Sequence, residues 1–229
     1  AKEIESKLIT QKFIQKVTIA GSMRRMKETI HDVDILVTTN DPKKTIDFFT
    51  SLSKKKLLAK GSTKASIILH NGLQVDIRVL DNNHYGSGLN YFTGSKEHGI
   101  KLRNLAIKKG LKLSEYGIFK GKKTIASKTE YDIYKALELQ YIEPELREDT
   151  GEIEFALKKK PPKLINYNDV LGDLQMHTKY SDGSNTIEEM ALKAKSLGRK
   201  YIAITDHYGG LAIANALNKR RILKQFKEI

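Results

Sequence analysis

Two aspartates separated by a single residue are the part of this sequence most able to do chemistry. Asp32 and Asp34 alternate with apolar residues in the stretch HDVDIL, and residues two apart in a β-strand point to the same side. Adjacent carboxylates repel each other unless they share a cation, and clustered oxygen ligands suit Mg²⁺ or Mn²⁺. The spacing therefore predicts a strand that presents a divalent-metal site.

A phosphate-binding turn and a third carboxylate complete the pattern. Gly21 and Ser22 lie between the apolar stretch VTIA and an expected helix, where backbone N–H groups can bind a phosphate. Asp76 lies in LQVDIRVL, which follows ASIILH and the hairpin dipeptide Asn71-Gly72. A hairpin beside the first strand would bring Asp76 to the same face. One site would then hold a metal and a triphosphate, which is the equipment for nucleotidyl transfer.

The elements that must position these residues alternate between helix and strand. Apolar periodicity predicts helices over 7–15, 22–30 and 45–52, and strands over 17–20, 32–39, 65–70 and 73–80. A strongly basic helix is expected after the segment YFTGSKEHG, and KKKPPK at 158–163 is expected to be a linker. Beyond it, a strand near VLGDLQM, a helix over 186–198 and a strand over 200–207 predict a βαβ unit.

Composition restricts the class of partner. The chain has 229 residues, 39% of them hydrophobic, which is enough for a core in one or two domains. Its net charge of +14 favours a polyanionic partner, nucleic acid before membrane, although a solvated basic surface is the simpler alternative. The chain has no Cys, no recognisable signal peptide and no long apolar run, which predicts a cytoplasmic protein that does not span a membrane.

Two further groups of residues can bind ligands. The basic helix carries Lys101, Arg103, Lys108 and Lys109, which either form a solvated face or follow a phosphate backbone. In the last part of the chain, polar residues follow the two expected strands, where α/β folds place their sites. The candidate metal ligands there are His177, Asp182 and His207.

Five segments in this order resemble the catalytic region of family X DNA polymerases, the group that includes DNA polymerase beta: GSMRR, DVDIL, VDIR, YFTGSKEH and SEYGIF. LQMHTKYSDG and ITDH resemble the start of the polymerase and histidinol phosphatase (PHP) domain appended to bacterial and archaeal members. The resemblance implies an α/β (α+β) fold. It comprises a nucleotidyltransferase palm with a mixed β-sheet and flanking helices, a small α+β nucleotide-selecting subdomain, and a truncated βαβ piece of a PHP barrel.

The resemblance implies a role for each carboxylate. Asp32 and Asp34 match the pair that holds both metals, and Asp76 matches the third carboxylate, which holds the catalytic metal. One metal would lower the pKa of the primer 3′-hydroxyl, and the other would clamp the triphosphate and the leaving pyrophosphate. Mg²⁺ or Mn²⁺ is therefore expected at this site, and Zn²⁺ or Mn²⁺ at a PHP site in the full-length protein.

It also implies the residues that bind nucleotide and DNA. The triphosphate contacts match Gly21, Ser22 and Arg25. The segment that lies against the sugar and discriminates against a 2′-hydroxyl matches Tyr91, Phe92, Gly94 and Ser95. The residues expected to contact DNA or to respond to it are Arg78, Lys101, Arg103 and Tyr116. Gapped or primer-template DNA and a dNTP are the implied partners, and a monomer is expected.

Three residues depart from the family pattern. Gly99 stands where members usually carry an Asn that contacts the incoming base, which puts tight nucleotide selection in doubt. Gln74 stands where eukaryotic relatives carry a basic residue near the primer end. Gln175 replaces the first His of the expected His-x-His, and Gln is a poor substitute for imidazole at a transition-metal site. We therefore expect no competent PHP nuclease in this chain.

The implied domains are a palm over 1–90, a nucleotide-selecting and DNA-contacting subdomain over 91–157, a basic Pro-containing linker over 158–168, and the N-terminal part of a truncated PHP domain over 169–229. Family members also carry an N-terminal lyase-type domain and a helix-hairpin-helix segment, so the chain is expected to be a fragment.

The first functional hypothesis is a gap-filling, template-directed DNA polymerase for repair. Its alternatives are a template-independent nucleotidyltransferase, a PHP-type phosphoesterase or 3′-5′ exonuclease in the full-length protein, and a non-catalytic DNA-binding remnant.

Overall fold

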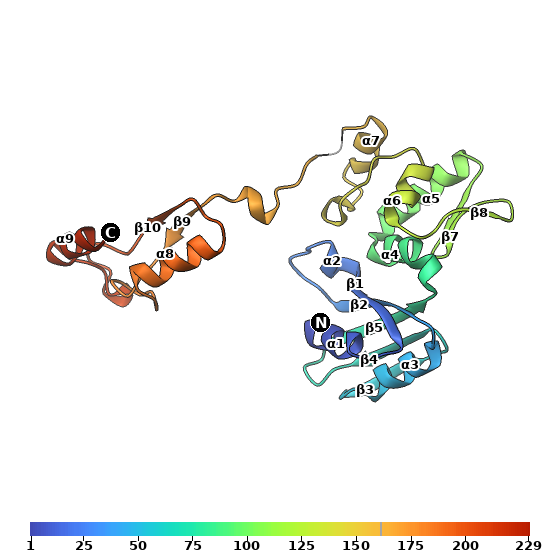
Figure 1. Ribbon diagram of the computed structural model, residues 1–229, viewed down its shortest axis with the longest axis horizontal. Coiled ribbons are helices and arrows are strands. Elements are labelled where there is room, and N and C mark those ends of the chain that lie inside the picture. The colour runs from blue at the N-terminus through green and yellow to red at the C-terminus, as the bar shows by residue number, and fades with distance from the viewer. Residues whose placement is uncertain (161) are drawn as a thin grey trace. The chain divides into compact units, whose positions relative to one another are not determined.

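The computed structural model describes residues 1–160 and 162–229, and the chain divides into two compact units, residues 1–162 and 163–229 (Figure 1). The larger unit combines a mixed sheet with helices, and the smaller one is a βαβ unit with an additional helix. The predicted α/β (α+β) class is confirmed. No helix in the described parts of the chain is both long enough and apolar enough to cross a bilayer.

A five-stranded sheet with the order β1-β2-β5-β4-β3 forms the base of the larger unit (Figure 1). Its central strands β2 and β5 pair in parallel, whereas the other neighbours are antiparallel. The strands are β1 (Ile14–Ile19), β2 (Asp32–Thr39), β3 (Lys56–Lys60), β4 (Lys64–Ile68) and β5 (Gln74–Leu80).

One face of this sheet is the main hydrophobic core. Val33, Ile35 and Val37 alternate with the aspartates of β2 and are at most 1% exposed. The helices α1 (Lys2–Ile9) and α3 (Pro42–Ser51) contribute buried side chains to the same cluster. The alternation therefore turns the aspartates toward the opposite face.

The opposite face of the sheet is only partly covered. Leu36 and Leu80, near the ends of β2 and β5, form a buried cluster with Ala20 and with Leu89 of α4 (Tyr85–Thr93). The polar residues that come earlier in the two strands are not covered by this cluster and are only partly buried: Asp32, Asp34, Gln74 and Asp76. This open part of the face is where the carboxylates lie.

The second part of the larger unit is helical around a small antiparallel sheet with the order β6-β7-β8. It has its own core, in which Leu102, Ile118, Ile133 and Ile142 are fully buried. Its elements after α4 are α5 (Lys96–Lys108), β6 (Lys112–Ser114), β7 (Gly117–Lys120), β8 (Lys123–Ala126), α6 (Glu130–Ala136) and α7 (Glu152–Leu157).

A buried carboxylate connects the two parts. Glu130 accepts hydrogen bonds from Arg24, in the short helix α2 (Gly21–Arg24), at 2.7 and 3.0 Å. The same carboxylate accepts from Arg147 at 2.6 Å, and the Arg147 side chain is fully buried. Burial favours the neutral form of Glu130, but the Arg24 and Arg147 guanidinium groups outweigh this effect and lower the pKa of Glu130. The connection is therefore ionic at neutral pH.

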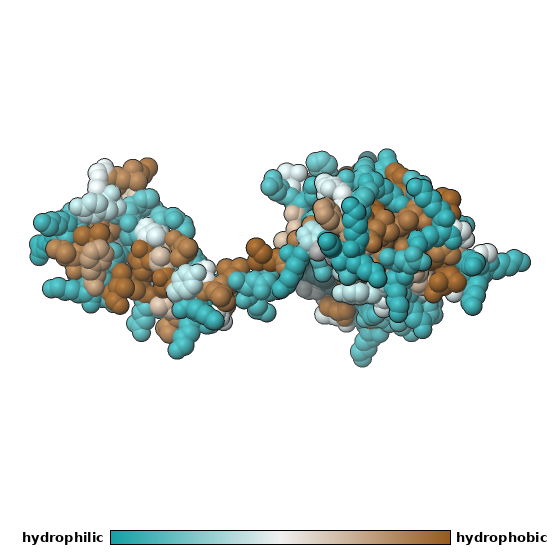
Figure 2. Space-filling model, turned by 90° about the horizontal axis from the view of Figure 1, so that it is seen from above, coloured by the Kyte–Doolittle hydropathy of each residue, from teal (hydrophilic) through white to brown (hydrophobic). Residues whose placement is uncertain are grey.

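The smaller unit contains two parallel strands, β9 (Gly172–Met176) and β10 (Tyr201–Ile204), joined through helix α8 (Ile187–Ser196). Helix α9 (Lys219–Glu228) follows. Large apolar side chains are exposed on this unit, Ile213 and Phe226 among them, and brown hydrophobic patches are visible on its surface in Figure 2. The predicted βαβ unit is confirmed.

Several predicted elements differ from the structure. The helix predicted over 7–15 is wrong because α1 ends at Ile9 and the chain is already a strand from Ile14. Pairing of β1 with β2 outweighs the helical pattern of these residues. The helix predicted over 22–30 is a single turn, and edge strand β3 was not predicted. The strand over 32–39, the helix over 45–52 and the hairpin of β4 and β5 are confirmed.

The buried carboxylate at the connection gives a stability prediction. Glu130→Ala should lower the free energy of unfolding of the larger unit by about 3–5 kcal/mol, because the buried Arg147 guanidinium loses its charge partner. Urea unfolding followed by circular dichroism measures the change. Glu138→Ala is the control, since that carboxylate is exposed in its pair with Lys109 and its loss should have no measurable effect. Equal losses in the two variants would contradict the structural role of Glu130.

Candidate functional site

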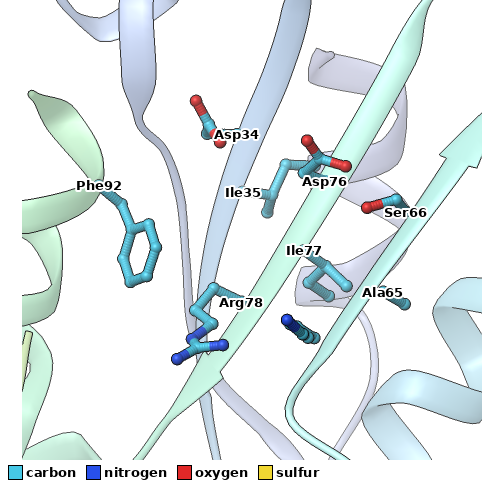
Figure 3. A pocket seen from close by; sticks show the side chains of 9 residues that line it. Asp34, Ile35, Ala65, Ser66, Asp76, Ile77, Arg78 and Phe92 are labelled. Atoms are coloured by element: carbon cyan, nitrogen blue, oxygen red, sulfur yellow. The ribbon is translucent and has the colours of Figure 1, made fainter. Parts of the chain in front are cut away.

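Three carboxylates lie on the open face of the sheet. The parallel register of β2 and β5 sets Asp34 opposite Asp76 and Asp32 opposite Gln74. Asp32 and Asp34 are two apart, so all three aspartates project from the same face. Figure 3 shows Asp34 and Asp76 on neighbouring strands, with Ser66 of β4 next in the same row. The backbone thus produces the arrangement that the sequence predicted.

The carboxylate oxygens do not converge fully. Among the described residues, the only three potential ligands with atoms all within 4.8 Å of one another are in the smaller unit, so Asp32, Asp34 and Asp76 are more widely spread than that. Gln74 accounts for part of this spread, because its amide nitrogen lies 3.2 and 3.0 Å from the two oxygens of Asp76. Gln74 therefore directs the Asp76 carboxylate along its own strand.

Electrostatics favour a cation at this site. Burial first, and then the neighbouring charges of Asp32 and Asp76, raise the pKa of Asp34 to about 6. A carboxylate that is desolvated and repelled by two others is stabilised in its charged form by a positive charge that it can share. Oxygen-only ligands on one face fit a hard divalent cation such as Mg²⁺ or Mn²⁺.

Gly21 packs directly against Asp34. A Cβ atom at Gly21 would lie 2.1 Å from Asp34 Oδ2, and its φ of +60° is one that side chains disfavour. The Ala20 N–H also donates to the Asp34 carbonyl oxygen at 2.8 Å. The sequence predicted that Gly21 lets a phosphate approach the backbone. The structure shows in addition that the absence of a side chain at Gly21 leaves room for the Asp34 carboxylate.

A cleft of about 380 Å³ lies beside the carboxylates. It brings together most of the predicted residues from both parts of the larger unit: Gly21, Ser22, Arg25, Asp32, Asp34, Tyr91, Phe92, Gly94, Ser95 and Arg103. A smaller adjoining pocket of about 230 Å³ contains Asp34, Asp76, Arg78 and Phe92 among its lining residues (Figure 3). The two cavities share Asp34 and Phe92.

Arg25 and Arg78 have fixed partners at these cavities. The Arg25 Nε–H donates to Glu148 at 2.8 Å, and Nη1 donates to the Thr93 carbonyl oxygen at 2.5 Å. Arg78 lies over the Phe92 ring at 5.5 Å and pairs with Glu115 at 3.5 Å. Both arginines therefore link the sheet to the helical part.

The predicted DNA-contacting residues have different environments. Arg103 lines the cleft and lies over the Tyr91 ring at 5.9 Å. Lys101 is engaged by Asp149 and Glu154, so its charge is already balanced. Tyr116 is 43% exposed. Of these residues, only Arg103 lines the large cleft, and the DNA-binding roles remain predictions.

The candidate ligands of the smaller unit converge. His177 Nδ1 lies 2.8 Å from Asp182 Oδ1, and His207 Nε2 lies 3.5 Å from Asp182 Oδ2. The Gln175 amide nitrogen lies 3.2 Å from His177 Nε2. Two imidazoles and one carboxylate form a donor set that fits Zn²⁺ or Mn²⁺, with Gln175 at the side where another ligand would bind.

Some cleft residues were not predicted from the sequence. Asn90, Lys96 and Ser114 line the cleft beside the expected residues, and Lys96 and Ser114 lie inside the quoted segments YFTGSKEH and SEYGIF. Glu148, which contacts Arg25, was not among the predicted site residues either. Its contact with Arg25 spans 123 positions of sequence, so no local pattern could have revealed it.

Comparison with known proteins agrees with this geometry. Residues 88–148 match the sequence model described as the DNA polymerase beta thumb, and residues 173–227 match the PHP domain. The whole chain is 38% identical to the DNA polymerase/3′-5′ exonuclease PolX of Bacillus subtilis, and it covers 41% of that protein. It is 31% identical to rat DNA polymerase lambda over 56% of this chain and 28% of that protein.

A viral relative is similar over most of its own length. Repair DNA polymerase X of African swine fever virus is 27% identical over 58% of this chain and 82% of that protein. A polymerase beta thumb joined to a mixed sheet with three aspartates defines the class as a polymerase beta-like core. With the PHP segment that follows, the chain belongs to the family X DNA polymerases, among the members that carry a PHP domain.

The raised pKa of Asp34 gives a prediction with a definite sign. The folded state binds this proton more tightly than the unfolded chain does, so stability falls as pH rises from about 4 to about 6. In EDTA at pH 7, Asp34→Asn should therefore raise the free energy of unfolding by about 1–2 kcal/mol, after allowance for solvent screening. Urea unfolding of both proteins measures this difference in the free energy of unfolding. At pH 4 the difference should vanish, and a variant that is less stable at pH 7 would contradict the prediction.

Proposed function

We propose that this chain contains the catalytic core of a DNA-directed DNA polymerase. It would transfer a nucleotidyl group from a dNTP to a primer 3′-hydroxyl, and its role would be gap filling in DNA repair. The observation that carries the proposal is the cleft in which the aspartate pair, the Gly-Ser turn and the YFTGS segment meet. Relatives named as DNA polymerases support it.

Different residues would bind the metal ions and the triphosphate. Asp32, Asp34 and Asp76 would hold two divalent metal ions, which when bound supply a more acidic 3′-hydroxyl and charge neutralisation of the triphosphate. Ser22 and Arg25 would bind the phosphates from one side of the cleft. Because β2 and β5 pair in one sheet, the backbone sets the three aspartates on one face before the substrate arrives, and metal binding would draw their oxygens together.

The opposite wall of the cleft would select the sugar. Tyr91 and Phe92 form the end of helix α4, and Gly94 follows with a φ of +72°. A Cβ at Gly94 would meet Arg25 Nη1 at 3.1 Å. Arg25 therefore lies close against the backbone at this point, which supports a steric exclusion of the ribose 2′-hydroxyl by the chain path rather than by ring chemistry.

DNA would bind through the basic surface. The net charge of +14 supports a nucleic-acid partner, and long hydrophilic side chains project from the face of the larger unit seen in Figure 2. Arg103, which lies over the Tyr91 ring at the cleft, would contact the template strand next to the incoming nucleotide.

The ligand cluster in the smaller unit supports metal binding rather than a second catalytic activity. His177, Asp182 and His207 lie close enough together to hold one metal ion, and the Bacillus relative is named a 3′-5′ exonuclease as well as a polymerase. In this chain we propose that the site holds a metal weakly and does not support hydrolysis, because Gln175 replaces a stronger ligand.

The polymerase proposal predicts template-dependent extension. With a gapped DNA, Mg²⁺ and the four dNTPs, the chain should add the nucleotide that the template specifies. Asp76→Asn should slow the single-turnover rate by on the order of 10²–10⁴-fold but leave dNTP binding nearly unchanged, because the ligand that it removes serves the hydroxyl. Asp47→Asn, in α3 on the other face of the sheet, is the matched control. Addition that ignores the template would favour a template-independent nucleotidyltransferase instead.

The metal cluster gives a separate prediction. Calorimetric titration should show weak Zn²⁺ binding that His207→Ala abolishes and that Gln175→His strengthens by roughly tenfold or more, since an imidazole replaces an amide. The unmodified chain with Mn²⁺ should leave a 3′-labelled single strand intact. Degradation that His207→Ala abolishes would show that the site is catalytic despite Gln175.

A further inference from the structure

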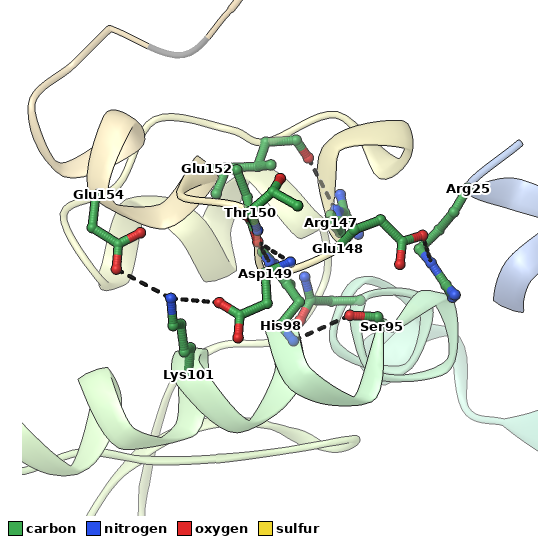
Figure 4. Close-up of polar contacts among 12 residues, drawn as sticks. Arg25, Ser95, His98, Lys101, Arg147, Glu148, Asp149, Thr150, Glu152 and Glu154 are labelled. Atoms are coloured by element: carbon green, nitrogen blue, oxygen red, sulfur yellow. Dashed lines mark hydrogen bonds and ion pairs between the residues drawn. The ribbon is translucent and has the colours of Figure 1, made fainter. Parts of the chain in front are cut away.

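Arg25 lines the cleft and is held on two sides. Figure 4 shows its contact with Glu148. Its Nε–H donates to Glu148 Oε1 at 2.8 Å and its Nη1 donates to the Thr93 carbonyl oxygen at 2.5 Å. The Arg25 side chain is only 13% exposed. Among the described residues, nothing accepts a hydrogen bond from Nη2, so this end of the fork retains its donors.

Glu148 is presented by a loop that is itself fixed. The Ser95 N–H donates to the Arg147 carbonyl oxygen at 3.0 Å, and the buried Arg147 side chain bonds to Glu130 and to the Ile142 carbonyl oxygen. The residue before Glu148 is therefore tied both to the wall of the cleft and to the core.

The residues after Glu148 are tied as well (Figure 4). The N–H groups of Asp149 and Thr150 donate to the Glu152 carboxylate, which also bonds to His98 Nδ1 at 2.6 Å. Burial opposes the charge of Glu152, but these hydrogen bonds outweigh it and lower its pKa to about 2. A loop anchored on both sides keeps the Glu148 carboxylate in one place.

A carboxylate beside a phosphate-binding arginine can act in two opposite ways. It can hold the guanidinium in the orientation that the phosphate needs, or it can compete with the phosphate for the same donors. The geometry distinguishes the two. Glu148 takes the Nε edge and Thr93 takes Nη1, so neither occupies Nη2. A carboxylate that blocked the phosphate would be expected to accept from Nη2 as well, since Nη2 completes a bidentate pair with either Nε or Nη1.

We propose that Glu148 is a positioning residue for nucleotide binding, which orients Arg25 so that its remaining N–H groups meet the triphosphate. The inference rests on the proposed polymerase function and assigns a role in it to the thumb loop around Glu148. An ordered guanidinium loses less side-chain entropy when the nucleotide binds.

The test uses the full 229-residue chain and three variants. Glu148→Ala removes the acceptor, Glu148→Gln keeps an oxygen for the Arg25 Nε–H, and Glu145→Ala removes an exposed carboxylate nearby as the control. Binding of dATP with Mg²⁺ is measured by calorimetry without DNA. The Nε–H signal of Arg25 in ¹⁵N NMR, assigned with Arg25→Lys, reports the contact directly, and thermal melting confirms that each variant is folded.

Glu148→Ala should weaken dATP binding by roughly three- to tenfold, which is what ordering one long side chain costs, and should lose exchange protection of the Arg25 Nε–H. Glu148→Gln should keep that protection and bind within about twofold of the unmodified chain, like Glu145→Ala. In extension assays the effect should fall on KM for the dNTP rather than on kcat.

Two results would overturn the inference in distinguishable ways. If Glu148→Ala binds dATP as tightly as the unmodified chain or more tightly, Glu148 competes with the triphosphate or is irrelevant, and the polymerase proposal stands. If the unmodified chain binds no dATP and extends no primer, the polymerase proposal fails together with the role of Glu148.

Discussion

The parallel pairing of β2 with β5 is the constraint on which the rest of the larger unit depends. These strands are separated by a helix and a hairpin in sequence, yet their register sets Asp34 beside Asp76. The same register aligns the buried valines and isoleucines on the other face into one core. A shift by one residue would bury the aspartates and expose the core, so the hydrophobic pattern that stabilises the sheet also fixes the site.

The helical part depends on this sheet through few but strong connections. The small apolar cluster around Leu36 and Leu89 covers one end of the open face. The ion pairs of Arg24 with Glu130 and of Arg25 with Glu148 lie beside it. The cleft is therefore lined by residues from the sheet and from the helical part, and it lies between their two hydrophobic cores. This explains how carboxylates can be partly desolvated without being enclosed.

The sequence predicted the strand of Asp32 and Asp34, the hairpin that returns Asp76 and the βαβ unit, because each depends on alternation or on turn residues that are local. It mistook the start of β1 for helix, since that strand exists only through its pairing with β2. Most cleft residues inside the recognisable segments were predicted, but Lys96 and Ser114 were not. Gln74 departs from the family pattern in the sequence, but only the structure shows its hydrogen bonds to Asp76. The contact of Glu148 with Arg25 is likewise visible only in the structure. Contacts between distant segments carry no local signal.

Arg24 and Arg25 are consecutive residues whose side chains bind two different carboxylates of the helical part. Because the two ion pairs start from adjacent residues and end on different carboxylates, together they restrict both rotation and translation of the helical part against the sheet, whereas one ion pair would leave rotation free. The turn they belong to is also the one whose Gly21 touches Asp34. Rotation of the helical part against the sheet would therefore break at least one of these ion pairs or displace the Asp34 carboxylate.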